Sequence, residues 1–202
     1  MTGVSSGSQG LLAVLDKPLI QYAIEEALDA GIAELIFVTA PTQRSGYGAF
    51  EHSDELQYEL QKRQKFDLIE LVLGWGAPHL TTVCVRQATE PGLCQALLCA
   101  RDLLEDEAFA LIVAEDLLHH QPNVLQQLMQ QYATLPSSAA TLFAVERQPQ
   151  DGALPRDSAQ GQLLSDRLVQ ISHITQASTH NLPHDDLGIV GRYLLPPDIF
   201  GH

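Results

Sequence analysis

The chain has 202 residues, of which 45% are hydrophobic, enough apolar material for one domain with a substantial core. It carries 25 Asp and Glu against 11 Lys and Arg, a formal charge of -14, so its average field repels phosphate backbones and anionic lipid. We therefore expect no nucleic-acid partner and no membrane partner. With no apolar run near the ~20 residues that span a bilayer, and no signal-peptide pattern in the opening residues, the sequence predicts a cytoplasmic protein.

The first predicted elements are a helix and a buried strand. Asp16 is a candidate N-cap for the helix, Pro18 is expected in its first turn and Gly31 at its end, with apolar residues recurring every three or four positions between them. Residues 34–39, ELIFVT, form a largely apolar run that predicts a strand buried on both faces. Residues 1–10 are rich in Gly and Ser, which predicts a flexible tail.

Further along the chain, strands and helices alternate. Strands are predicted at residues 79–87, 109–116 and 139–147, and helices at residues 53–73, 92–104 and 123–135. This alternation predicts an α/β fold with a mostly parallel sheet, right-handed crossovers and helices on both faces. After Pro149 we expect a hairpin or loop, followed by two strands at residues 167–175 and 187–195. Residues 11–202 are predicted to form a single domain.

Several of these segments carry a resemblance to a known family. They are LDKPLIQYAIEEALDAGIAELIFVT (residues 15–39), VRQ (85–87), GLCQALLCA (92–100) and DLGIVGRYLL (186–195). In order and approximate spacing they resemble bacterial UTP–glucose-1-phosphate uridylyltransferases, the UDP-glucose pyrophosphorylases, from Leu11 to Phe200. The resemblance implies a Rossmann-like nucleotidyltransferase fold of the nucleotide-diphospho-sugar transferase type. It also implies that UTP and glucose 1-phosphate give UDP-glucose and pyrophosphate, with Mg²⁺ as cofactor.

The resemblance assigns a set of substrate-binding positions. Gln87 stands where the family reads the edge of uracil, a task that suits an amide because it donates and accepts together. Gly92 matches the first glycine of a glycine-rich motif, and Cys94 stands at the second. Asp186 and Gly191, from the matched C-terminal motif, complete the predicted substrate-binding residues.

The metal position is implied in the same way. Glu115 matches the aspartate that binds Mg²⁺ in the family, and Asp116 lies beside it; carboxylate oxygens suit a hard cation. A capping or loop pair is the alternative interpretation. The adjacent His119 and His120 are expected to be solvated, because consecutive side chains rarely converge on one ion.

Two departures from the family bear on catalysis. The sugar-phosphate lysine of the family's EKP motif is absent, since the aligned residues are Ser172, His173 and Ile174. The arginine and lysines of the phosphate loop have no counterpart before Leu11, which also predicts a sheet that lacks its usual first strand. Residues 10–14 or a second chain would then fill the gap, or the fold would be loose. Nucleotidyl transfer depends on positioning and charge neutralisation, so we expect impaired or absent catalysis.

Three functions stay open at this point. An enzyme would transfer uridylyl groups, with Gln87 reading uracil and Glu115 or Asp116 holding Mg²⁺. A non-catalytic relative would bind UTP or UDP-glucose, or act through protein contacts as a homo-oligomer or as a hetero-oligomer with a full-length paralogue. A remnant with no small-molecule role would do neither.

Overall fold

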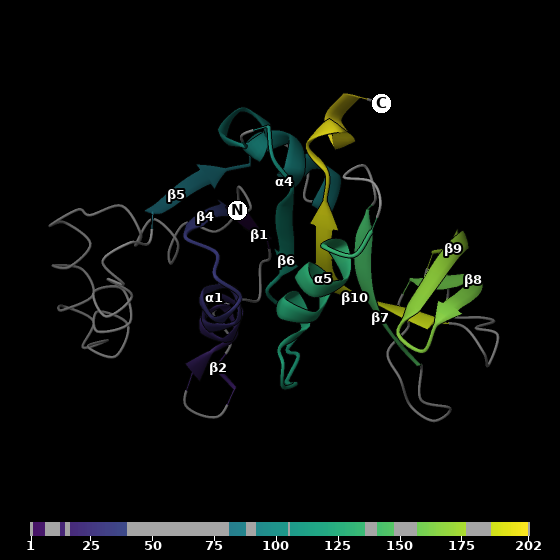
Figure 1. The fold of residues 1–202 in the computed structure, drawn as a ribbon. Helices are drawn as coiled ribbons and strands as arrows, with labels where there is room; N and C mark the ends of the chain where they lie inside the picture. The colour runs from purple at the N-terminus through teal and green to yellow at the C-terminus, as the bar shows by residue number, and fades with distance from the viewer. Residues whose placement is uncertain are drawn as a thin grey trace, which may run out of the picture. The chain divides into compact units, whose positions relative to one another are not determined.

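The computed structural model describes residues 2–6, 13–14, 17–39, 81–87, 92–104, 106–135, 141–147, 157–176 and 187–201 (Figure 1). The predicted helix at residues 53–73 lies outside them. The chain forms two compact units, where one domain was predicted over residues 11–202. The first unit combines Met1–Leu142 with Arg192–His202, and the second is Phe143–Gly191. None of the described helices has the length and apolar character needed to cross a membrane.

Parallel strands form the centre of the first unit. Their order is β5 (Thr81–Arg86), β4 (Glu34–Thr39), β1 (Thr2–Ser6) and β6 (Phe109–Val113). The pairings among these four strands are all parallel. The C-terminal part of β10 (Leu187–Leu195) joins β6 in the antiparallel sense, with Arg192 opposite Ile112. The predicted α/β class is confirmed, and the prediction of a mostly parallel sheet holds for this first unit.

The strand β1 corrects the prediction that the sheet lacks its first strand. Thr2–Ser6 lies between β4 and β6, with Val4 opposite Ile36 on one side and Leu111 on the other. The predicted flexible tail is therefore wrong for these five residues, while residues 7–10 lie outside the described part of the chain. Two neighbours satisfy the strand's backbone hydrogen bonds, which compensates for the few apolar side chains that it can bury.

Residues 13 and 14 do not fill a gap in the main sheet. Ala13–Val14 (β2) instead pairs with Lys17–Pro18 (β3) in a separate two-stranded sheet. Pro18, predicted in the first helical turn, thus lies just before α1 (Leu19–Asp29). The helix is closed by Gly31 at φ 83°, a backbone conformation that glycine adopts readily and other residues rarely do.

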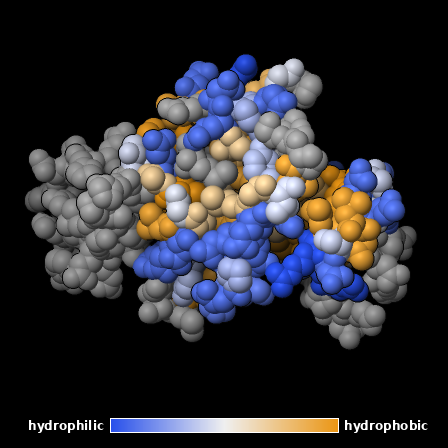
Figure 2. All heavy atoms as spheres, in the orientation of Figure 1, coloured by the Kyte–Doolittle hydropathy of each residue, from blue (hydrophilic) through white to orange (hydrophobic). Residues whose placement is uncertain are grey.

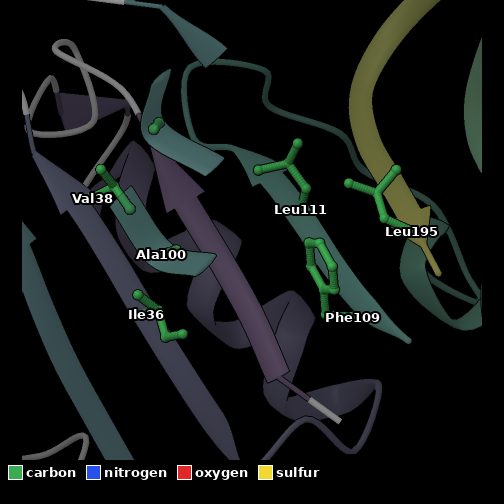
Figure 3. Packing of buried hydrophobic residues seen from close by; sticks show 7 residues of the cluster. Ile36, Val38, Ala100, Phe109, Leu111 and Leu195 are labelled. Carbon is green, nitrogen blue, oxygen red and sulfur yellow. The ribbon is translucent and has the colours of Figure 1, made fainter. Parts of the chain in front are cut away.

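One face of this sheet packs against α4 (Leu93–Ala100), which is followed by the short helix η2 (Arg101–Leu103). The core on this face consists of buried residues from α4, β4, β6 and β10, several of them labelled in Figure 3: Ile36, Val38, Ala96, Ala100, Phe109, Leu111 and Leu195. The short helix η3 (Pro197–Gly201) adds Phe200, whose ring stacks on that of Phe109 with centroids 6.0 Å apart. Alternation along each strand sends the intervening side chains to the opposite face.

The opposite face packs against α1 and α5 (Val124–Tyr132), which contact each other. Both helices are amphipathic, and their buried positions are Leu19, Ile20, Ala23, Ile24, Glu26 and Ala27 in α1 and Leu125 and Leu128 in α5. One member of this set, Glu26, is charged. Helices therefore cover both faces of the parallel strands, as predicted.

The strand pairings described for β8 (Ser158–Ser165) in the second unit are antiparallel. This unit contains most of β7 (Leu142–Arg147), the hairpin of β8 and β9 (Leu168–Thr175), and the start of β10. β8 pairs with β9 and with the first residues of β10. The segment in which a hairpin or loop was expected thus contains β8, the first strand of a hairpin. Figure 2 shows apolar side chains gathered over this hairpin, where Leu163, Leu164 and Ile174 are exposed.

Candidate functional site

The candidate site lies at the carboxyl ends of β5, β4, β1 and β6. The chain runs from β1 to β4 and β5 on one side, and β6 then pairs with the other side of β1. The strand order therefore reverses at β1. In open α/β sheets, ligands bind in the crevice beyond the carboxyl ends of the strands at such a switch point, here after Ser6 and Val113.

Gln87 follows the last residue of β5 and is buried, with 4% of its surface exposed. Its burial fits a residue that holds a defined position, in contrast to a solvated strand end. Because β5 leads into α4 through its carboxyl end, Gly92 and Cys94 belong to the same edge of the sheet. Both are exposed, Gly92 as the N-cap of α4 and Cys94 in its first turn.

The backbone of Gly92 does not require glycine. Its φ of 164° is extended backbone, and a Cβ atom added there would meet nothing within 4 Å. Cys94 has a free thiol. The described structure therefore shows no steric reason for a glycine at either position, and their predicted contact with substrate stays a prediction.

Glu115 and Asp116 lie in a tight turn directly after β6. The backbone N–H of Asp116 donates to the carbonyl oxygen of Val113 over 3.2 Å, which closes the turn. Both acidic residues are half-buried, and Ala114 beneath them is 2% exposed. The turn therefore holds two adjacent carboxylates at the switch point.

Arg192 donates hydrogen bonds to the backbone of this turn. Its Nη1 donates to the carbonyl oxygen of Val113 and its Nη2 to that of Asp116, both over 3.0 Å. The residue is 2% exposed and belongs to the part of β10 that pairs with β6. One guanidinium thus contacts both ends of the turn that carries the carboxylates.

Glu26 of α1 pairs with this guanidinium. Its Oε2 accepts from Nε of Arg192 over 2.9 Å and lies 2.9 Å from Nη2, with side-chain exposures of 7% and 2% for the acid and the base. Its Oε1 accepts from the backbone N–H of Leu125, near the start of α5. A single buried ion pair therefore links α1, α5, β10 and the turn after β6.

The first turn of α5 is fixed by a capping box. The Asn123 side chain accepts from the backbone N–H of Gln126, and the Gln126 side chain accepts from the backbone N–H of Asn123. Asn123 also donates to the carbonyl oxygen of Glu26, and Gln126 to that of Asp29. These bonds tie α5 to the last turns of α1 and keep the N–H of Leu125 aimed at Glu26.

The pair Glu26–Arg192 was not predicted, although each residue left a signal in the sequence. Arg192 is the one basic residue in the apolar strand LGIVGRYLL. Glu26 lies among apolar positions on the buried face of an amphipathic helix. Two isolated opposite charges on apolar faces suggest a buried pair, because an unpaired buried charge is very unfavourable.

The remaining predicted positions lie in other parts of the chain. Asp186 lies outside the described residues, and Gly191 is buried in the part of β10 that belongs to the second unit. His119 and His120 are exposed, and His120 Nδ1 lies 3.0 Å from the carbonyl oxygen of Pro122. His173 is exposed in the β8–β9 hairpin.

A cavity of about 330 Å³ lies elsewhere in the first unit. Arg101, Asp106, Asp198 and Phe200 contribute to its lining, with the guanidinium of Arg101 5.8 Å from the centre of the Phe200 ring. It borders the first residue of β6, at the amino ends of the parallel strands. No predicted substrate or metal residue lines it.

The turn after β6 fits a magnesium ion that keeps several waters. Mg²⁺ is commonly bound by one or two carboxylates together with substrate phosphates, and it needs no complete protein cage. Within the described ranges no group of three or more His, Cys, Asp or Glu residues could hold a metal ion alone. Glu115 makes other interactions, yet its Oε2 atom is buried and accepts no hydrogen bond from the described residues. Two carboxylates without a closed cage suit this mode of binding.

Comparison with known proteins agrees with the fold. A family model described as "Nucleotidyl transferase" matches residues 5–152. The chain is 32% identical to a UTP–glucose-1-phosphate uridylyltransferase of Bacillus subtilis, a match that covers 94% of this chain and 64% of the relative. It is also 32% identical to the Pseudomonas aeruginosa protein of the same name, with coverages of 94% and 67%.

A solved structure extends the match to the fold. The crystal structure of a UDP-glucose pyrophosphorylase complexed with UDP-glucose superposes with a TM-score of 0.77 at 26% identity, covering 99% of this chain and 77% of that one. The chain spans about two thirds of the length of the two curated relatives. Sequence, family model and fold agree, and the chain therefore belongs to the nucleotidyl transferase family, as a divergent member of its UTP–glucose-1-phosphate uridylyltransferases.

Proposed function

We propose that the chain binds a uridine nucleotide or nucleotide sugar, UTP or UDP-glucose, across the carboxyl edge of its parallel strands, with little or no turnover. The position of β1 between β4 and β6 carries this proposal, because it supplies the switch point at which such sheets bind ligands. The UDP-glucose held by a structural neighbour supports the same class of ligand.

Gln87 would read the base, and the turn after β6 would lie near the phosphates. Three strand spacings separate β5 from β6 in the sheet order, about 14 Å at ~4.8 Å per spacing. A separation of this kind lets one elongated ligand be held at its base and at its phosphates by different strands. A buried amide at the β5 end can both donate to and accept from uracil.

Glu115 and Asp116 would hold Mg²⁺ together with the phosphates of the ligand. When bound, the ion neutralises phosphate charge and orients the phosphate chain. The protein's own contribution is the rigid turn, which keeps both carboxylates at the switch point through the bond between Asp116 N–H and the Val113 carbonyl.

Low turnover follows from the missing cations. Residues 7–16, which connect β1 to Lys17, contain neither Lys nor Arg. In nucleotidyl transfer such side chains hold and neutralise the phosphates, and removing one charge-stabilising donor typically lowers the rate by ~10²- to 10³-fold. We therefore expect binding to be retained more fully than catalysis.

Uridylyl transfer from UTP to glucose 1-phosphate is the second candidate function. The specific observation in its favour is again β1, since the central strand that the sequence seemed to lack is present. Release of pyrophosphate in the presence of UTP, glucose 1-phosphate and Mg²⁺ would establish it. A cytoplasmic location, and a homo-oligomer or a hetero-oligomer with a full-length paralogue, stay predictions from the sequence.

The test is a thermal melt with and without UDP-glucose plus MgCl₂. Ligand at about 100 times its dissociation constant adds about 2.7 kcal/mol of unfolding free energy, which shifts the melting temperature of a chain of this size by about 5–10 °C. Gln87→Met keeps the volume of the side chain and removes its amide, so it should abolish the shift. Gln130→Met is the control, because it makes the same change at an exposed position of α5 and should keep the full shift.

Each outcome has a defined meaning. A shift that Gln87→Met loses and Gln130→Met keeps supports binding at this edge. No shift of wild type with UDP-glucose or UTP at millimolar concentration would refute the proposal. An equal shift in wild type and Gln87→Met would place the ligand elsewhere.

A further inference from the structure

We infer that Arg192 is a positioning residue for the divalent cation: it fixes the turn Val113 to Asp116 and thereby sets the affinity of Glu115 and Asp116 for the ion. This inference rests on the metal site of the proposed function. It concerns a residue that is too deeply buried to reach substrate, with 2% of its surface exposed. Arg192 would therefore act through the backbone of the turn.

The hydrogen bonds of Arg192 lie at the two ends of the turn that carries the carboxylates. Nη1 and Nη2 donate to the carbonyl oxygens of Val113 and Asp116, the first and last residues of the turn. The turn's own hydrogen bond, from Asp116 N–H to the Val113 carbonyl, joins the same two residues. Rotation of the Glu115–Asp116 peptide group would break the turn's own bond, and rotation of the peptide group that follows Val113 or Asp116 would break a bond to Arg192.

The guanidinium is itself held in one orientation. Its Nε and Nη2 atoms both lie 2.9 Å from Oε2 of Glu26, and the backbone of Arg192 is in register with Ile112 of β6. A planar fork with donors in fixed directions can bind two carbonyls and a carboxylate at once. A lysine ammonium carries the same charge on a flexible stem and cannot span the same three acceptors at these distances.

The charge of Arg192 is neutralised locally. Glu26 forms a close ion pair with it, and both side chains are buried, at 2% and 7% exposure. The net electrostatic effect of the pair on a cation held by the turn is therefore small compared with that of an isolated guanidinium. What the pair supplies is geometry, in the way that residues behind metal ligands commonly orient them.

The experiment measures Mn²⁺ binding to the full chain by electron paramagnetic resonance, without nucleotide. Compared with wild type, Arg192→Lys should raise the Mn²⁺ dissociation constant by about 10- to 100-fold, the range seen when partners of metal ligands are removed. Leu111→Ala is the control. It empties part of the core on the same strand and lowers the melting temperature, but Leu111 packs in the cluster on the α4 face and is expected to leave the dissociation constant within twofold of wild type.

A second variant keeps the inference testable if Arg192→Lys does not fold. Glu26→Gln retains an acceptor for Arg192 but removes the ion pair, and should weaken Mn²⁺ binding by about threefold or more. Glu25→Gln, one position earlier on α1, should not change it. The inference would be overturned if Arg192→Lys bound Mn²⁺ as tightly as Leu111→Ala. If Arg192→Lys is unfolded, it would be overturned if Glu26→Gln bound Mn²⁺ as tightly as Glu25→Gln.

Failure of the proposed metal site gives a different result. If wild type binds no Mn²⁺ up to millimolar concentration, the carboxylates of the turn are not a metal site at all. If wild type binds and Asp116→Asn does not, the site is present, and the comparison of Arg192→Lys with Leu111→Ala then decides the role of Arg192 alone.

Discussion

Removing the charge of Glu26 is expected to lower the free energy of unfolding far more than removing that of its neighbour Glu25. Glu26→Gln leaves Arg192 charged in a site where the two side chains are only 7% and 2% exposed. Leaving one member of a buried ion pair uncompensated costs about 3–5 kcal/mol, and we place Glu26→Gln near about 3 because the one oxygen of glutamine still accepts from Arg192, while its NH₂ group then faces the N–H of Leu125. Glu25→Gln affects an i, i+4 contact with Gln21 on the helix surface, worth about 0.5 kcal/mol or less.

A double-mutant cycle tests whether the pair itself is responsible. Arg192→Met should cost about 4 kcal/mol alone, since Glu26 and two carbonyls lose their donor. Combined with Glu26→Gln it should cost about 4 rather than about 7, because no charge remains buried; the coupling energy is then about 3 kcal/mol. Urea unfolding followed by circular dichroism gives these values, provided the slope against urea is unchanged. Costs that simply add in the double variant, or a Glu26→Gln effect within about 0.5 kcal/mol of Glu25→Gln, would refute the reasoning.

Two further predictions concern local structure. Asn123→Ala removes the cap of α5 and the bond to the Glu26 carbonyl, so it should lower the unfolding free energy by about 1–2 kcal/mol, measured by thermal melting. Gly161→Ala should disrupt the β8–β9 hairpin, because its Cβ would lie 2.1 Å from the backbone oxygen of Gln170; the measurement is faster amide hydrogen exchange in that hairpin. Gly201→Ala has open space around its Cβ and should leave exchange unchanged, and unchanged exchange in Gly161→Ala as well would contradict the prediction.

Where a strand consists of one mostly apolar run, the sequence alone was sufficient to locate it. β4 and β10 have the predicted bounds, because ELIFVT and LGIVGRYLL are apolar enough to be buried whatever surrounds them. α1 ends as predicted, since Gly31 adopts the φ of 83° that closes the helix. These signals need no knowledge of distant residues.

β1 could not be predicted in this way. TGVSS contains one large apolar residue, Val4, and its composition is typical of a tail. Its strand conformation is set by β4 and β6, whose edges it joins, so the determinant lies in tertiary context that overrides local propensity.

Prediction of the site was limited for the same reason. The resemblance directed attention to Gln87, Glu115 and Asp116 one position at a time, and the structure places all three at the carboxyl edge of the parallel strands. The residues that hold the turn are Arg192 and Glu26, which are 166 positions apart in the chain. No periodicity or motif spacing relates two residues at that distance, so only the folded structure can pair them.

The first unit is built from two separate stretches of the chain, and this constrains the order in which the chain can fold. Its residues up to Leu142 are made first, but the strand segment that covers the outer edge of β6 begins at Arg192, after the whole second unit. Until that segment arrives, an apolar strand, FALIV, has unpaired backbone groups on one side, and Glu26 is without its counter-ion. An exposed apolar strand edge favours pairing with other chains. During synthesis, the first unit therefore cannot be completed until the second unit has been made. In that interval the nascent first unit depends on chaperones or on rapid synthesis to avoid aggregation.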